Sequence, residues 1–141
     1  MKLKLVRQLK GSEVIRNLNV KYGSVDNLKE LIKKDPENFL YQHDLENWLL
    51  YQKHPHRVIE ERETIFLNYS EIRRSDLKLL EIIKKQNPSS ISKLSAILNQ
   101  DLEEVQPQVQ RLAMDGLLKL VPGPQDDERP VVNFVKIEFE L

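Results

Sequence analysis

The chain has 141 residues, of which 40% are hydrophobic and 31% charged, a balance typical of a globular rather than a disordered protein. Its 22 basic and 22 acidic residues cancel, and neither half is basic overall, which disfavours indiscriminate nucleic-acid binding. The lack of cysteine excludes disulfides, cysteine-ligated zinc and thiol nucleophiles, and no apolar run approaches the roughly 18 residues of a spanning helix. The first residues also lack the apolar region of a signal peptide, so we expect a cytoplasmic protein without membrane contact.

The N-terminal region, residues 1–63, reads as a mixed, mainly helical extension. Leu3 and Leu5 alternate with lysines, which predicts a short strand, whereas residues 13–22 give no clear pattern. Ser24 is expected to cap a first helix.

A second helix of this region is expected to have Asp35 as its N-cap and Pro36 as its first residue, and to run to about Gln52. Leu40, Trp48 and Leu49 lie on it with little core of their own. We therefore predict that the extension forms a homodimer or binds a partner protein.

The second region, residues 64–141, has clearer signals for helices. Ser75 is expected to cap a helix that continues through Lys85, and Ser90 to cap a short second helix. Asp101 is expected to cap a third helix, which Gly116 ends because glycine adopts a positive φ at little cost.

Strands are expected on both sides of these helices. Residues 64–69 have the β-branched and aromatic bias of a strand, and residues 117–121 form a short apolar run. A polar loop, 122–129, follows, and residues 131–141 alternate as in one long strand. The predicted fold is therefore α+β.

Three helices followed by a hairpin is the layout of a winged helix-turn-helix domain. In such a domain the short second helix and its tight turn present the third helix to the major groove of DNA. The hairpin loop forms the wing, which meets the DNA backbone or the minor groove. We thus divide the chain into an extension, 1–63, and a winged helix-turn-helix domain, 64–141.

A resemblance to known regulators supports this interpretation. The run Leu112–Leu118 resembles the L-x-x-x-G-L-[IVL] segment that ends the recognition helix and opens the wing of MarR-like regulators. Arg129–Val132, with the alternating strand after it, is similar to a narrower family of predicted archaeal and bacterial winged-helix regulators, some of which look like antitoxins paired with a toxin. The resemblance covers about residues 64–141 and implies a DNA-binding fold; residues 1–63 resemble no family.

The resemblance also implies which side chains face DNA. Four polar residues of the third helix fall where this class presents side chains to bases, and glutamine suits adenine as arginine suits guanine. Serines and a lysine of the second helix would contact phosphates, and two basic residues flank the wing. The predicted DNA-binding set is Ser90, Ser92, Lys93, Gln106, Gln108, Gln110, Arg111, Lys119 and Arg129.

Some features of the same region favour a different partner. Pro107 interrupts the hydrogen bonding of the third helix, and Glu103 and Glu104 place negative charge at its start. Residues 126–128 make the wing acidic. A winged helix that binds only protein, as a toxin-neutralising or scaffold module, therefore stays open beside DNA binding.

No motif of the chain indicates an enzyme, a cofactor or a metal site. His54 and His56 lie two apart in a loop near glutamates, which is a weak metal signal. Tyr41, Trp48 and Tyr51 fit a small core or a dimer contact better than an aromatic ligand site. We expect a sequence-specific regulator of transcription that binds double-stranded DNA as a homodimer, and an autoregulating antitoxin with a toxin partner is one form of this function.

Overall fold

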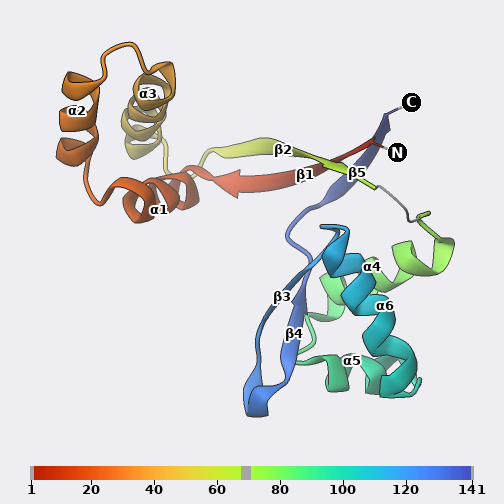
Figure 1. Ribbon diagram of the computed structural model, residues 1–141. Coiled ribbons are helices and arrows are strands. Elements are labelled where there is room, and N and C mark those ends of the chain that lie inside the picture. The colour runs from red at the N-terminus through yellow and green to blue at the C-terminus, as the bar shows by residue number, and fades with distance from the viewer. Residues whose placement is uncertain (1, 68–70, 141) are drawn as a thin grey trace. The chain divides into compact units, whose positions relative to one another are not determined.

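The computed structural model describes residues 2–67 and 71–140 and has an α+β architecture, as the sequence predicts (Figure 1). The elements follow one another in this order: β1 (Lys2–Lys10), α1 (Gly11–Tyr22), α2 (Val25–Lys34), α3 (Phe39–Lys53), β2 (Val58–Phe66), α4 (Arg74–Gln86), α5 (Ile91–Leu98), α6 (Leu102–Met114), β3 (Lys119–Pro122), the 3₁₀ turn η1 (Pro124–Asp126), β4 (Glu128–Val131) and β5 (Lys136–Glu140).

The chain divides into two compact units, and each is described by itself. The larger unit combines Met1–Val6 with Arg62–Leu141, and the smaller unit is Arg7–Glu61. Strands β1 and β2 contribute residues to both units. One boundary was predicted, after residue 63, whereas the chain passes from one unit to the other twice, after Val6 and after Glu61, because β1 pairs with β5.

The larger unit contains both ends of the described chain in one sheet. Strand order in this sheet is β2-β1-β5, and β1 pairs with β5 antiparallel, with Leu3 opposite Phe139 and Leu5 opposite Ile137. Leu3 and Leu5 are buried, which fits the predicted alternation with lysines. The N-terminal strand is therefore part of the core of the larger unit.

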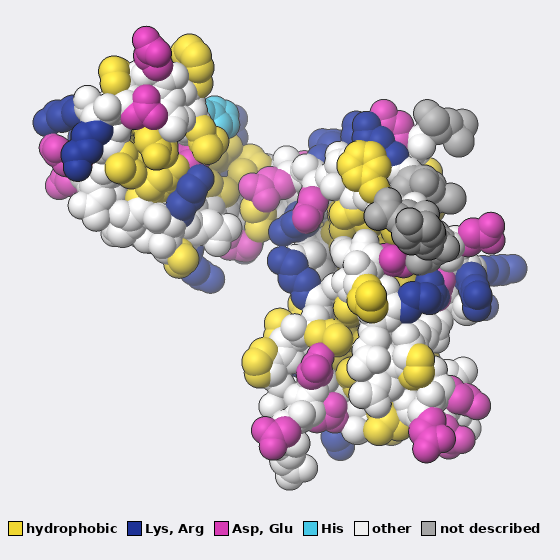
Figure 2. Space-filling view, viewed as in Figure 1, with side chains coloured by type: hydrophobic (Ala, Val, Ile, Leu, Met, Phe, Trp, Pro, Cys, Tyr) yellow, Lys and Arg dark blue, Asp and Glu magenta, His cyan; other side chains and the backbone are white. Residues whose placement is uncertain are grey.

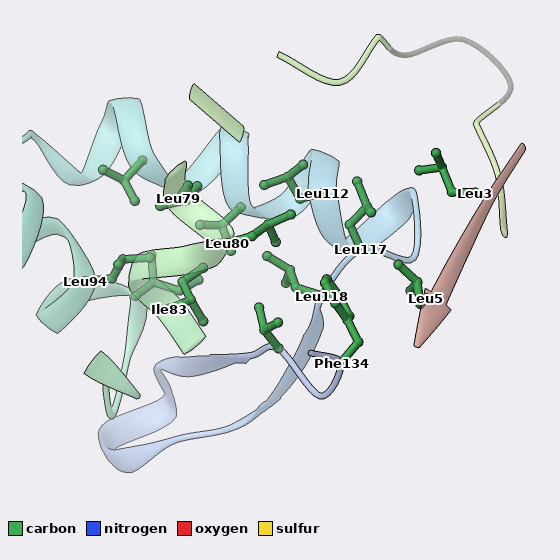
Figure 3. Packing of buried hydrophobic residues seen from close by; sticks show 14 of the residues in the cluster. Leu3, Leu5, Leu79, Leu80, Ile83, Leu94, Leu112, Leu117, Leu118 and Phe134 are labelled. Carbon is green, nitrogen blue, oxygen red and sulfur yellow. The ribbon is translucent and has the colours of Figure 1, made fainter. Parts of the chain in front are cut away.

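Helices α4, α5 and α6 supply most of that core. Figure 3 shows leucines and Ile83 from these helices packed together with Phe134 and with Leu3 and Leu5 of β1. The buried cluster is Leu3, Leu5, Leu67, Leu79, Leu80, Ile83, Ile91, Leu94, Val105, Val109, Leu112, Leu117, Leu118, Val132 and Phe134. It joins sequence-distant segments into one hydrophobic core.

The predicted ends of these helices are mostly confirmed. Ser90 caps α5, and its hydroxyl accepts a hydrogen bond from the Lys93 amide. Gly116 follows α6 with a φ of 84°, as expected for a helix-ending glycine. Asp101 stands at the N-cap of α6 but its side chain makes no capping bond. The prediction for Ser75 was wrong, because α4 begins at Arg74 and Arg73 is the N-cap residue.

The single long strand predicted over 131–141 was also wrong. β3 and β4 form a two-stranded antiparallel hairpin with Val121 opposite Arg129, and the chain then leaves this pair before β5 joins the other sheet. Val132 and Phe134, in the connection, are buried in the core. Burial of this connection interrupts the strand, which the alternating pattern alone did not reveal.

The strand predicted over 64–69 is β2, which begins earlier, at Val58. The charged residues 60–63 belong to it because most of the strand is exposed to solvent, so its charges need no burial. Residues 68 and 69 lie outside the described part of the chain.

In the smaller unit, α1 occupies the segment 11–22, most of which gave no clear pattern in the sequence. Ser24 caps α2 as predicted, through a bond from the Asn27 amide. The prediction of Asp35 as a cap and Pro36 as the first helical residue was wrong. Asn38 caps α3 instead, and its side chain accepts from two backbone amides at the start of that helix.

The core of the smaller unit is built around Leu18, Leu28 and Trp48. The Tyr22 hydroxyl donates a hydrogen bond to Asp44, which ties α1 to α3. Gly11 starts α1 where a Cβ atom would lie 2.4 Å from the carbonyl oxygen of His54, so only glycine fits there. The burial of Trp48 agrees with a small core, one of its two predicted places, whereas the expectation that its segment has little core of its own was wrong.

Leu28→Ala tests whether this small core holds the unit together. We expect it to lower the free energy of unfolding of the smaller unit by about 2–5 kcal/mol, because Leu28 is fully buried and truncation leaves a cavity. The fluorescence of Trp48, the single tryptophan of the chain, would follow unfolding in denaturant. Val20→Ala is the matched control, since Val20 is 85% exposed, and an equal loss of stability in both variants would contradict the assignment.

Candidate nucleic-acid interface

The faces of α6 decide which predicted side chains can act together. Val105, Val109 and Leu112 are buried and mark the side of the helix that faces the core. Gln106 and Gln110 are exposed and lie one turn apart on one flank.

Gln108 and Arg111 lie on the other flank of α6 and are only partly exposed. Gln106 and Gln108 point in nearly opposite directions, because two residues turn an α-helix by roughly 200°. The structure thus separates the four predicted α6 residues into two pairs.

A surface groove lies beside Gln106 of the first pair. It is bounded by the start of α5, the first turns of α6 and the loop between β3 and β4, and it has a volume of about 860 Å³. Four of the predicted residues, Ser90, Ser92, Lys93 and Gln106, line it. α5, with its cap residue, and α6 therefore bring part of the predicted set to one place, and the hairpin loop closes the groove beside them.

Hydrogen bonds connect the hairpin loop to the start of α5 at this groove. The Ser92 hydroxyl donates to Asp127 Oδ2 at 2.7 Å. This bond is the main reason that the pKa of the Asp127 carboxyl lies below its ordinary value. Ser90 is 5% exposed and its hydroxyl accepts the capping bond of α5, so its side chain offers little surface to a ligand.

The second pair of α6 residues is bound to a buried carboxylate, Asp76 of α4. Asp76 has no exposed surface, and its Oδ1 accepts from Gln108 Nε2 at 3.0 Å and forms an ion pair with Arg111. Its Oδ2 accepts from the Arg73 amide at 2.9 Å, at the start of α4. The cluster joins the first turn of α4 to the middle of α6.

The charge of Asp76 is favoured by these partners. Burial alone would raise the pKa of the Asp76 carboxyl, but the bonds from Arg73 and Gln108 and the positive charge of Arg111 outweigh it and hold the pKa below its ordinary value. Asp76 is therefore ionised at neutral pH and holds Gln108 and Arg111 in place.

The two predicted wing residues lie on the hairpin strands, away from the groove lining. Lys119 of β3 is exposed and stands opposite Val131, and Arg129 of β4 is partly exposed and stands opposite Val121. The structure does not bring either of them into the groove.

The groove can offer hydrogen bonds more readily than strong positive charge. Its charged lining residues are Lys93, Asp126 and Asp127, and its neutral polar ones include Gln106 and Gln125. Acidic and basic side chains are interspersed over the visible face of the larger unit in Figure 2. Such a surface suits selective hydrogen bonding better than attraction to any polyanion.

Asp76 was not among the residues predicted for the site. Its signal is an acidic residue three positions after the N-cap, where a carboxylate can accept from the N-cap amide. Placing the cap at Ser75 hid this spacing.

His54 and His56, the weak metal signal of the sequence, do not form part of a metal-binding cluster among the described residues. Within residues 2–67 and 71–140, no three His, Asp or Glu side chains lie together so as to hold a metal ion. No helix of the described chain is both long and apolar enough to cross a membrane.

Comparison with known proteins gives one similarity. Residues 71–139 match the model of the protein family HVO_A0114. The matched segment runs from just before α4 into β5 and so includes the groove and the Asp76 cluster. No curated protein and no solved structure matches the chain.

Asp76→Asn tests the cluster. We expect it to lower the free energy of unfolding of the larger unit by about 1–3 kcal/mol at pH 7, because asparagine removes the charge that Arg111 and Gln108 face. A lowered pKa stabilises the fold above the ordinary carboxyl value of roughly 3.9, and this contribution is lost as pH falls through the folded pKa. The gap between variant and wild type should therefore shrink in acid.

Amide hydrogen exchange of buried residues in α4 and α6 would measure this stability. Glu81→Gln is the control, since Glu81 lies on the same helix but pairs with Lys85 in solvent, and no change is expected there. An Asp76→Asn protein as stable as the wild type at pH 7 would refute the role of the cluster.

Proposed function

We propose that α4, α5, α6 and the β3–β4 hairpin form a winged helix-turn-helix domain and that the protein is a sequence-specific DNA-binding regulator of transcription. The order of elements supports this, as does the likeness of Leu112–Leu118 to MarR-like regulators. We place its action in the cytoplasm.

The observation that carries the proposal is the groove of about 860 Å³ where α5, α6 and the hairpin loop meet. In a winged helix these three elements contact one stretch of DNA together. Gln106 lines the groove, and Gln110 lies one turn further along α6. Both are exposed and chemically suited to pairing with adenine.

The Asp76 cluster changes the roles proposed for the other α6 residues. Gln108 and Arg111 would have to give up their bonds to a buried carboxylate before they could reach a base. We therefore assign base contacts to Gln106 and Gln110, and phosphate contact to Lys93, which is exposed near the start of α5. Gln108 and Arg111 fix the orientation of α6.

A second candidate is a protein-binding module that never contacts DNA. Its supporting observation is the acidity of α6 and the hairpin: Asp126 and Asp127 line the groove, and Glu103, Glu104 and Glu128 are exposed outside its lining. This surface suits a basic protein, and a toxin neutralised by the chain is one such partner. Phosphates would be repelled by the same residues.

DNA binding is tested by fluorescence anisotropy with duplex DNA from upstream of the protein's own gene and with a scrambled duplex. At near-physiological salt we expect a Kd at or below roughly 1 μM for the upstream duplex and at least about tenfold weaker binding to the scrambled one. Gln110→Ala and Gln106→Ala should each cost about 1–3 kcal/mol of binding, because each loses a base contact.

Gln86→Ala, at the end of α4 and outside the groove, is the matched control and should bind like the wild type. Equally weak binding to both duplexes, unchanged by the α6 substitutions, would disprove sequence-specific DNA binding and favour the protein-binding candidate.

We also propose that the smaller unit makes a homodimer, so that one dimer carries two α6 helices for the two half-sites of a DNA operator. Figure 2 shows hydrophobic side chains on its surface, and Phe39 and Leu40 are each more than half exposed. Sedimentation should give a dimer that Leu40→Glu weakens. A wild-type monomer at every concentration would contradict the proposal.

A further inference from the structure

A second groove of the larger unit lies away from the candidate DNA surface. It runs between α4 and the segment 132–137 and has a volume of about 240 Å³. Its lining is mainly apolar, and Leu77 and Val135 remain 38% and 50% exposed. Leu80 and Phe134, which Figure 3 shows in the core, form part of its wall. None of the predicted DNA-binding residues lines it.

The size of this groove favours side chains as its occupants. Pockets that enclose a small-molecule ligand have volumes of about 300–1,000 Å³, so this one is small for a whole ligand. It has room for one or two large apolar side chains. A protein segment can supply these while the rest of its chain remains outside.

Basic residues surround the apolar lining. Three lysines, Lys84, Lys85 and Lys136, line the groove with one acidic residue, Glu81. Lys85 pairs with Glu81 and Lys136 with Glu138, which is outside the lining. Lys84 donates to the carbonyl oxygen of Val132 at 3.4 Å and forms no ion pair among the described residues. The charge of Lys84 is therefore available to an acidic partner.

The neighbouring strand offers main-chain contacts as well. β5 is an edge strand of the sheet β2-β1-β5, and its residues Lys136 and Ile137 line the groove. The outer edge of a strand presents amide and carbonyl groups to which another chain can add. A polypeptide can use this edge and the apolar groove at once.

We propose that this groove is a docking site for an acidic segment of a partner protein. One or two large apolar side chains of the segment enter the groove, its Asp or Glu residues face Lys84, and its backbone runs along the edge of β5. The site is separate from the proposed DNA surface, so a DNA-bound molecule could hold a second protein here.

The test uses the full chain and two fluorescein-labelled synthetic peptides of about ten residues, the length of a long strand. In one peptide, valine and phenylalanine alternate with glutamate, and in the other lysine replaces each glutamate. We expect the acidic peptide to bind with a Kd of roughly 10–100 μM and the basic peptide at least about tenfold more weakly, as measured by anisotropy.

Substitutions then locate the binding. Lys84→Glu should reverse the preference between the two peptides, whereas Lys78→Glu, on α4 but outside the groove, should leave it unchanged. Val135→Ser should weaken binding of the acidic peptide at least about tenfold. Met114→Ser is its control, because Met114 is exposed in the same unit but does not line the groove.

Three results would overturn the proposal. The first is that neither peptide binds the wild type. The second is that Lys84→Glu and Val135→Ser bind the peptides as the wild type does. The third is that sedimentation shows a wild-type dimer that Val135→Ser converts to a monomer. The last result would mean that a second copy of this chain fills the groove. Since the peptide assay contains no DNA, these outcomes are independent of the proposed DNA binding.

Discussion

The pairing of β1 with β5 is the contact on which the larger unit depends. It places Leu3 and Leu5 over a core otherwise supplied by residues far along the chain, and both leucines are nearly fully buried. Their burial removes two large apolar side chains from water, worth about 1.5–3 kcal/mol each. The helices that carry the proposed DNA surface thus rest on a core that the N-terminal strand helps to close.

Within that core, one carboxylate relates two helices to each other. Asp76 is fully buried. It is held by the backbone amide of Arg73, the side-chain amide of Gln108 and the guanidinium of Arg111. The same contacts that stabilise α6 against α4 occupy two polar residues that would otherwise be free for ligands. The stabilising contacts thus use one flank of α6, and the other flank, with Gln106 and Gln110, is the one proposed to contact DNA.

Much of the fold follows from local patterns. Ser24, Ser90 and Gly116 behave as expected because capping and glycine conformation are decided within a few residues. The prediction of one strand over residues 131–141 was wrong because an alternating pattern does not show which strands pair with each other.

The site was harder to predict than the fold. Gln106, Gln108 and Gln110 look alike in sequence, but only their angular positions on α6 separate exposed residues from the one bound to Asp76. That bond joins residues 32 positions apart, and no local pattern reports it. Similarly, the apolar groove beside β5 arises from α4 and a segment some 50 residues later.

The discontinuity of the larger unit has a consequence for biosynthesis. Residues 7–61 can complete their three-helix core as soon as they leave the ribosome, because every contact of that core lies within the segment. Leu3 and Leu5, which emerge earlier still, must wait until β5 has been translated before they find their partners. β1 is therefore secured only after β5 has been made, and until then its two leucines are exposed to solvent or to chaperones.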